Sequence, residues 1–135
     1  RAPVKRFLSP LHRAPVPSSC LLRELARAGA ELEGALDEAF ALSLNEAMTL
    51  CAIAQERVPA SFVSEQTGLS ASLTSRVVNA LEERGFVIRS LGREDRRQVF
   101  FELTSEGSSL LARLRVHPFV LPKLLQGLPL ESLLS

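Results

Sequence analysis

Residues 64–88 read SEQTGLSASLTSRVVNALEERGFVI, and this stretch decides the fold. We expect a short helix to end at Gly68, because glycine readily adopts the left-handed conformation that closes many helices. Ser70 is a typical N-cap for a longer helix over about 71–84, which Gly85 should end in the same way. Two helices joined by a tight turn are typical of a helix-turn-helix. Its longer helix is predicted to face the core with Leu73, Val77 and Leu81.

Behind this pair of helices the sequence predicts a β-hairpin. Residues 86–91 and 98–103 are rich in β-branched and aromatic side chains and have a period of two, which is typical of strands. The polar loop 92–97 joins them. A hairpin directly behind the longer helix makes the pattern that of a winged helix-turn-helix.

The segment before this stretch is predicted to be helical. Ser43 followed by Glu46 forms a capping box that begins a second helix, running to about Glu56. Pro59 suits the first position of the short third helix. A long amphipathic first helix is predicted over 18–42, because apolar residues recur there every three or four positions at Leu22, Leu25, Ala28, Leu32, Leu36 and Phe40.

The C-terminal segment is predicted to be helical but interrupted. Thr104 is a suitable N-cap for a leucine-rich region that follows the hairpin. Prolines at 118, 122 and 129 interrupt that region, so we expect a break near His117 and Pro118.

Charge is distributed unevenly although the formal net charge is only +1. Residues 1–27 carry six basic side chains against one acid, and residues 28–56 carry six acids with no lysine or arginine. Residues 76–97 hold six arginines against four acids. A near-neutral total therefore does not exclude a nucleic-acid partner.

The longer helix and the hairpin tip carry side chains suited to DNA. No acid occurs on this helix before Glu82, and small or hydroxylic side chains allow close approach to base edges and phosphates. The positions expected to be exposed there are Ala71, Ser72, Thr74, Ser75, Arg76 and Asn79. Arginines at the hairpin tip suit a narrow minor groove, and they are Arg93, Arg96 and Arg97. Asp95 lies among them and favours DNA binding only if it pairs with one of them and fixes the loop.

The order and spacing of these motifs resemble the MarR family of winged helix-turn-helix transcriptional regulators, from about Leu42 to Ser132. Each motif alone is weak evidence for this family, whereas their order and spacing along the chain are specific to it. The likeness rests on Leu42-Ser43 with Glu46, TGLS at 67–70, LTSR at 73–76, LEERGFVIR at 81–89, DRR at 95–97, LTSEG at 103–107 and the segment 128–133.

The resemblance implies a homodimeric bacterial regulator in the cytoplasm, bound to a roughly palindromic operator in double-stranded DNA. A repressor released by a small effector is the typical case, and a chain without Trp or Tyr suggests an apolar or aromatic effector. Arg97 is implied in the minor groove, with Arg96 at a phosphate and Asp95 completing the wing motif. The recognition helix is implied to carry Ser70, Ser72, Thr74, Ser75 and Arg76.

The predicted fold is thus mainly α with a small β-hairpin wing, and we expect four parts. Residues 1–17 form an irregular, basic, proline-rich arm. An N-terminal dimerisation helix covers 18–42 and the winged helix-turn-helix lobe covers 43–103. C-terminal dimerisation helices follow over 104–135, since a leucine-rich segment with little charge needs a partner surface.

The sequence leaves two other functions open. Cys20 lies near the start of the first helix, where hydroperoxide-sensing relatives keep a reactive cysteine, so a thiol-based redox sensor is one alternative. A buried, inert thiol is the competing expectation for it and for Cys51. A winged helix that contacts only proteins is the other alternative. We expect no enzyme, cofactor, metal site or membrane segment, because no convergent set of ligands or nucleophiles and no long apolar run is present.

Overall fold

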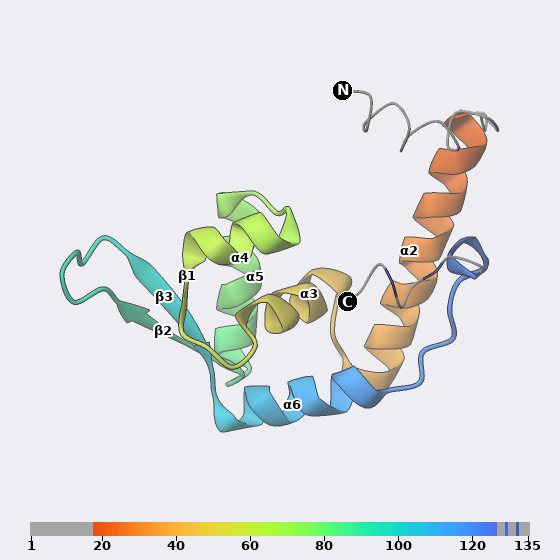
Figure 1. Cartoon of the computed structure of the whole chain (residues 1–135). Coiled ribbons are helices and arrows are strands. Elements are labelled where there is room, and N and C mark those ends of the chain that lie inside the picture. The colour runs from red at the N-terminus through yellow and green to blue at the C-terminus, as the bar shows by residue number, and fades with distance from the viewer. Residues whose placement is uncertain (1–17, 127–128, 130–131, 133–135) are drawn as a thin grey trace. The chain divides into compact units, whose positions relative to one another are not determined.

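The computed structural model of this chain describes residues 18–126, 129 and 132. The chain forms two compact units, of which one comprises Leu32–Val120 and the other the described residues on either side. The predicted arm at 1–17 lies outside the described residues. The elements in chain order are α2 (Ser18–Phe40), α3 (Leu44–Ile53), β1 (Val58–Pro59), α4 (Ala60–Thr67), α5 (Ala71–Glu83), β2 (Val87–Leu91), β3 (Val99–Leu103), α6 (Ser105–Val116) and the 3-10 helix η1 (Lys123–Leu125) (Figure 1).

The unit over 32–120 has one hydrophobic core, to which its helices and strands all contribute. Among its fully buried side chains are Leu50 and Ile53 from α3, Val63 from α4, Leu81 from α5 and Leu111 from α6. Burying one such side chain stabilises the fold by about 1.5–3 kcal/mol. This core holds α5 and the hairpin in place, so the predicted winged helix-turn-helix is confirmed as a packed lobe of helices with a small sheet.

The sheet has three antiparallel strands in the order β1-β3-β2. In β2 and β3, Val87 pairs with Leu103 and Leu91 with Val99, as the predicted hairpin requires. Figure 1 shows this hairpin extending away from α3, α4 and α5. Sequence reasoning missed β1, because it is only two residues long and one of them is proline, which suits an edge strand.

The predicted helix ends around α5 are confirmed. Ser43 and Glu46 form the capping box of α3, and the Ser70 hydroxyl accepts a hydrogen bond from the Leu73 N–H at 3.1 Å. Gly68 and Gly85 have φ of 76° and 81°, in the left-handed region. Each cap satisfies a backbone group that a helix terminus leaves free.

Two ends differ from the prediction. Helix α3 stops at Ile53 rather than near Glu56, because Ala54 turns into positive φ at 52°. Pro59 precedes α4 and belongs to β1 rather than opening the helix. Helix α6 ends at Val116, one residue before His117, which confirms the break expected there.

The start of α6 is fixed against the turn between α5 and β2. The Thr104 hydroxyl donates to the Gly85 carbonyl at 2.6 Å, and the Thr104 N–H donates to the Phe86 carbonyl at 3.0 Å. Gly107 lies so close that a β-carbon there would stand 2.1 Å from the Phe86 oxygen. Among the described glycines, Gly107 is the one where an added β-carbon would meet its closest neighbour.

The other unit contains the first part of α2 and the segment after Val120. Ala28 is buried there, whereas Leu22 and Leu25 are 64% and 51% exposed. The apolar stripe predicted on the first helix is therefore only partly covered within one chain. Within the described residues, no helix is both long and apolar enough to cross a membrane.

Candidate nucleic-acid interface

The first turns of α5 present small hydroxyl side chains and one arginine. Ser72, Ser75 and Arg76 are exposed, and the first turn carries no acid. In the described part of the chain, the Arg76 guanidinium has no hydrogen-bond or ion-pair partner. Free N–H groups at the helix start add a partial positive charge. This surface is therefore suited to an anionic partner.

Thr74 corrects the predicted set of exposed residues. Its side chain is only 2% exposed, and its hydroxyl lies 3.0 Å from the Ser64 hydroxyl of α4. The buried face of α5 consists of Thr74, Val77, Val78 and Leu81, so it is turned relative to the predicted apolar stripe. A threonine can bury its methyl group when its hydroxyl has a partner, and the polarity of the residue hid this from the sequence pattern.

Asn79 is exposed but does not point freely to solvent. Its side-chain oxygen accepts a hydrogen bond from Arg89, whose guanidinium also lies 3.6 Å from Glu82 and 5.5 Å from the centre of the Phe101 ring. Asn79 and Arg89 therefore join α5 to β2. Arg89 was not among the predicted residues, although strand alternation places it on the same face as Val87, toward the core.

The wing loop is organised by its own polar groups. The Gly92 N–H donates to the Gln98 carbonyl at 2.9 Å, and the Gln98 N–H donates to the Asp95 carbonyl at 3.1 Å. One oxygen of the Asp95 carboxylate accepts from the Arg97 backbone N–H at 3.0 Å and from the Arg97 guanidinium at 3.3 Å. Asp95 thus pairs with a loop arginine, which is the condition that the sequence analysis set for it to favour DNA binding.

The arginines of the wing loop remain accessible. The Arg97 side chain is 93% exposed, so its ion pair with Asp95 adds little to stability. Arg93 and Arg96 are exposed, and neither has a hydrogen-bond or ion-pair partner in the described part of the chain. The loop thus offers three arginines, only one of which has an internal contact.

Arg57 is a further residue that sequence reasoning missed. It lies between α3 and β1, and it donates from Nε to the Ser90 hydroxyl at 3.0 Å and from Nη2 to the Leu91 carbonyl at 3.1 Å. Its guanidinium also lies over the Phe100 ring, 3.9 Å from the centroid. Spacing along the chain gave no signal for it, because its partners follow more than thirty residues later.

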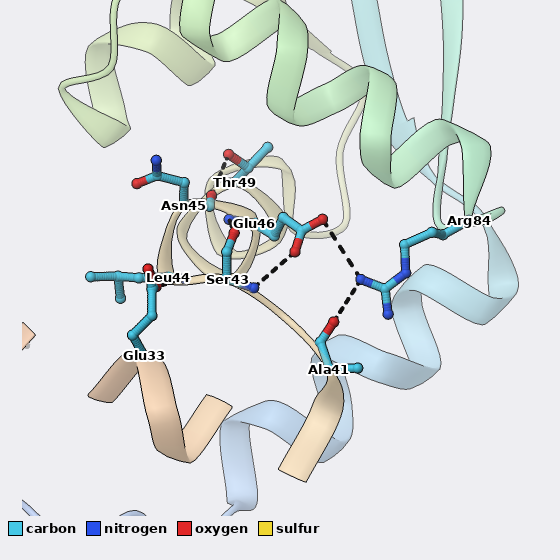
Figure 2. Close-up of polar contacts among 8 residues, drawn as sticks. All are labelled: Glu33, Ala41, Ser43, Leu44, Asn45, Glu46, Thr49 and Arg84. Carbon is cyan, nitrogen blue, oxygen red and sulfur yellow. Dashed lines mark hydrogen bonds and ion pairs between the residues drawn. The ribbon is translucent and has the colours of Figure 1, made fainter. Parts of the chain in front are cut away.

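The far end of α5 is tied to the corner between α2 and α3. Figure 2 shows the Arg84 side chain reaching to the Ala41 carbonyl, at 2.8 Å, and to the Glu46 carboxylate, at 3.6 Å. The other oxygen of Glu46 accepts from the Ser43 N–H at 2.8 Å. Glu33 accepts from the Leu44 N–H at 2.6 Å and holds the same corner from α2.

Replacing Arg84 by methionine should lower the free energy of unfolding by about 1–2 kcal/mol, because a partly buried pair and a carbonyl contact are lost. Urea denaturation measures this change. Glu83→Gln is the matched control, since Glu83 is the neighbouring exposed residue, and it should change stability by less than about 0.5 kcal/mol. Equal stabilities of the two variants would contradict the importance of this corner.

A pocket of about 270 Å³ lies between α4, α5 and the sheet. Ala60, Val99 and Phe101 give it apolar walls, while Ser75 and Arg89 supply polar groups. Ligand pockets typically measure about 300–1,000 Å³, so a pocket just below that range has room only for a small ligand. In the described part of the chain, no group of acidic, histidine and cysteine side chains is arranged to hold a metal ion.

Both cysteines are exposed, so the expectation of buried thiols is wrong. The buried residues of α3 are Ala47, Thr49, Leu50 and Ile53, and Cys51 falls outside this face. Partial removal of water from the thiol nevertheless raises the pKa of Cys51, and the Arg115 charge opposes the shift. Arg23 donates to the Cys20 sulfur at 3.6 Å. A redox role for Cys20 stays a prediction.

Comparison with known proteins agrees with this geometry. The model of the MarR family matches residues 42–98, which cover α3, β1, α4, α5, β2 and the wing loop. No curated protein matches the sequence. The match ends before β3 and α6, so the likeness of these two elements rests on the fold and not on the family model.

Solved structures share the fold at low sequence identity. The DNA complex of MepR from S. aureus has a TM-score of 0.67 at 17% identity, covering 75% of this chain and 76% of that one. BpsR from Bordetella bronchiseptica, described with its regulation by 6-hydroxynicotinic acid, has 0.66 at 22%, covering 76% of each chain. AbsC from Streptomyces coelicolor, a MarR family regulator, has 0.66 at 24%, covering 72% and 67%. Residues 42–98 thus match the model of the MarR family, and the chain shares its winged helix-turn-helix fold with these solved structures.

Proposed function

We propose that this chain is a sequence-specific, DNA-binding transcriptional regulator that acts as a homodimer in the bacterial cytoplasm. One observation carries the proposal: an exposed helix surface with unpaired Arg76 accompanies a hairpin whose loop exposes Arg93, Arg96 and Arg97. A helix of this kind enters the major groove, and a basic wing lies along the backbone or in the minor groove.

The proposed contacts differ slightly from the predicted set. On α5 they are Ser70, Ser72, Ser75 and Arg76, and on the wing they are Arg93, Arg96 and Arg97. Thr74 is left out because it is buried, and Asn79 and Asp95 are assigned to holding α5 and the wing loop in shape. The DNA complex of MepR supports this choice at the level of the fold.

Homodimerisation is supported by apolar side chains that the single chain leaves uncovered. Leu22 and Leu25 on α2 are more than half exposed, and Val116 at the end of α6 and Val120 beyond it are 80% and 86% exposed. Exposed apolar residues of this size favour a partner surface. A second copy would place two recognition helices about 10 base pairs apart on a palindromic site.

Release by a small molecule is the finer part of the proposal. The 270 Å³ pocket adjoins α5 and β2, so a ligand there would change the spacing between the recognition helix and the wing. Its walls suit a small apolar or aromatic molecule, and the nearby Arg89 suits a carboxylate. The regulation of BpsR by 6-hydroxynicotinic acid supports this class of effector, and a repressor is the simplest role.

Selection of bound fragments from a random DNA pool tests the proposal. We expect enrichment of a palindrome whose half-sites lie about one helical turn apart. A chain with Arg76→Ala and Arg97→Ala, treated in parallel, should enrich no such palindrome. If the unaltered chain enriches nothing over the starting pool, the DNA-binding function is wrong and a role in protein contacts is favoured.

A further inference from the structure

The outer face of the hairpin is held by one arginine from outside it. Arg57 precedes β1, which pairs with β3 and not with β2. To reach Ser90 and the Leu91 carbonyl on β2, the Arg57 side chain passes over the Phe100 ring of β3. It therefore connects the edge of the sheet to the residue directly before the wing loop.

The inner face is held by a second arginine in a similar way. Phe100 and Phe101 are consecutive residues of β3, so their rings point to opposite faces. Arg89 lies by the Phe101 ring and is bound to Asn79 and Glu82 of α5. The hairpin is thus fixed to α5 on one face and to the start of β1 on the other.

We propose that Arg57 is a positioning residue that sets the angle of the wing, so that the loop arginines reach DNA while α5 lies in the major groove. The proposal rests on the proposed DNA-binding function. Two of the three guanidinium nitrogens donate to β2, and the planar group stacks on Phe100, so Arg57 acts through the hairpin. Lysine cannot make the same set of contacts, because it lacks the planar, forked donors of a guanidinium.

Amide hydrogen exchange in the free protein tests the positioning without DNA. The N–H groups of Gly92 and Gln98 both donate within the wing loop and report on its order. In the Arg57→Met and Arg57→Lys variants, we expect these two amides to exchange at least about threefold faster than in the unaltered chain. The reason is that the contacts of Arg57 with β2 and Phe100 are lost. Arg115→Met removes an equal charge from α6 and should leave both rates unchanged. Unchanged rates in the Arg57 variants would overturn the proposal.

A double-mutant cycle tests the consequence for binding. On the selected operator, Arg57→Met should weaken binding about tenfold when Arg97 is present and by less than about twofold when Arg97 is already alanine. Arg57→Lys should lose nearly as much as Arg57→Met. Equal losses in both backgrounds, with lysine restoring affinity, would show a direct phosphate contact and overturn positioning. If the unaltered chain binds no DNA, the proposed function fails, and the exchange rates alone decide whether Arg57 orders the wing.

Discussion

Replacing Gly107 by alanine should cost the protein about 3 kcal/mol of unfolding free energy or more, because the added β-carbon has no space. It would stand 2.1 Å from the Phe86 carbonyl oxygen and 3.3 Å from the Leu103 β-carbon. The carbonyl cannot move away easily, since it accepts the Thr104 N–H. The variant must therefore shift α6 or break that hydrogen bond, and chemical denaturation measures the loss.

Gly34→Ala is the matched control for this prediction. A β-carbon at Gly34 meets nothing within 4 Å, and the residue lies within α2. Alanine is favoured over glycine in a helix by about 0.5–1 kcal/mol, so this variant should be as stable as the unaltered chain or more so. A Gly107→Ala variant of equal stability would show that α6 does not lie against the Phe86 carbonyl.

Replacing Arg97 by alanine should weaken operator binding by about ten- to a hundredfold and reduce the dependence of affinity on salt. Two effects add. A groove or phosphate contact is lost, and the Asp95 carboxylate loses the guanidinium that neutralises it at 3.3 Å. The Asp95 carboxylate would then lie near DNA without the guanidinium that pairs with it. Titration of labelled operator at several salt concentrations measures both the affinity and its salt slope.

A double variant separates the two effects. Adding Asp95→Asn to Arg97→Ala removes the negative charge and should recover part of the lost affinity. Arg115→Ala, which removes an exposed arginine from α6, is the charge control and should leave affinity nearly unchanged. Unaltered binding by Arg97→Ala would show that the wing does not reach the DNA.

Local signals in the sequence were sufficient to predict the recognition helix and the hairpin. Ser70 caps the helix, and Gly68 and Gly85 adopt the left-handed conformation that their positions require. These features depend on neighbouring residues alone. The end of α3 escaped prediction because Ala54, which is not glycine, takes a positive φ of 52° that only the surrounding structure can impose.

Contacts between distant segments were beyond the reach of the sequence. Arg57 meets Ser90 and Leu91 through the fold, and Arg89 meets Asn79 across the gap between strand and helix. Thr74 was assigned to the surface because its hydroxyl looked like a free donor, while Ser64, which lies beside that hydroxyl, is ten residues earlier. The sequence thus predicted the exposed arginines of the candidate site. It did not predict the side chains that fix α5 and the hairpin in position.

In the wing loop, different residues determine backbone shape and surface charge. The turn depends on Gly92, the Asp95 carboxylate and the backbone of Gln98, and Asp95 binds the main-chain N–H of residue 97 whatever side chain that residue carries. The arginine side chains can therefore vary without rebuilding the loop. A regulator built in this way can change its preferred DNA through a few surface substitutions while its folding stability stays nearly constant, which makes the wing an evolvable part of the molecule.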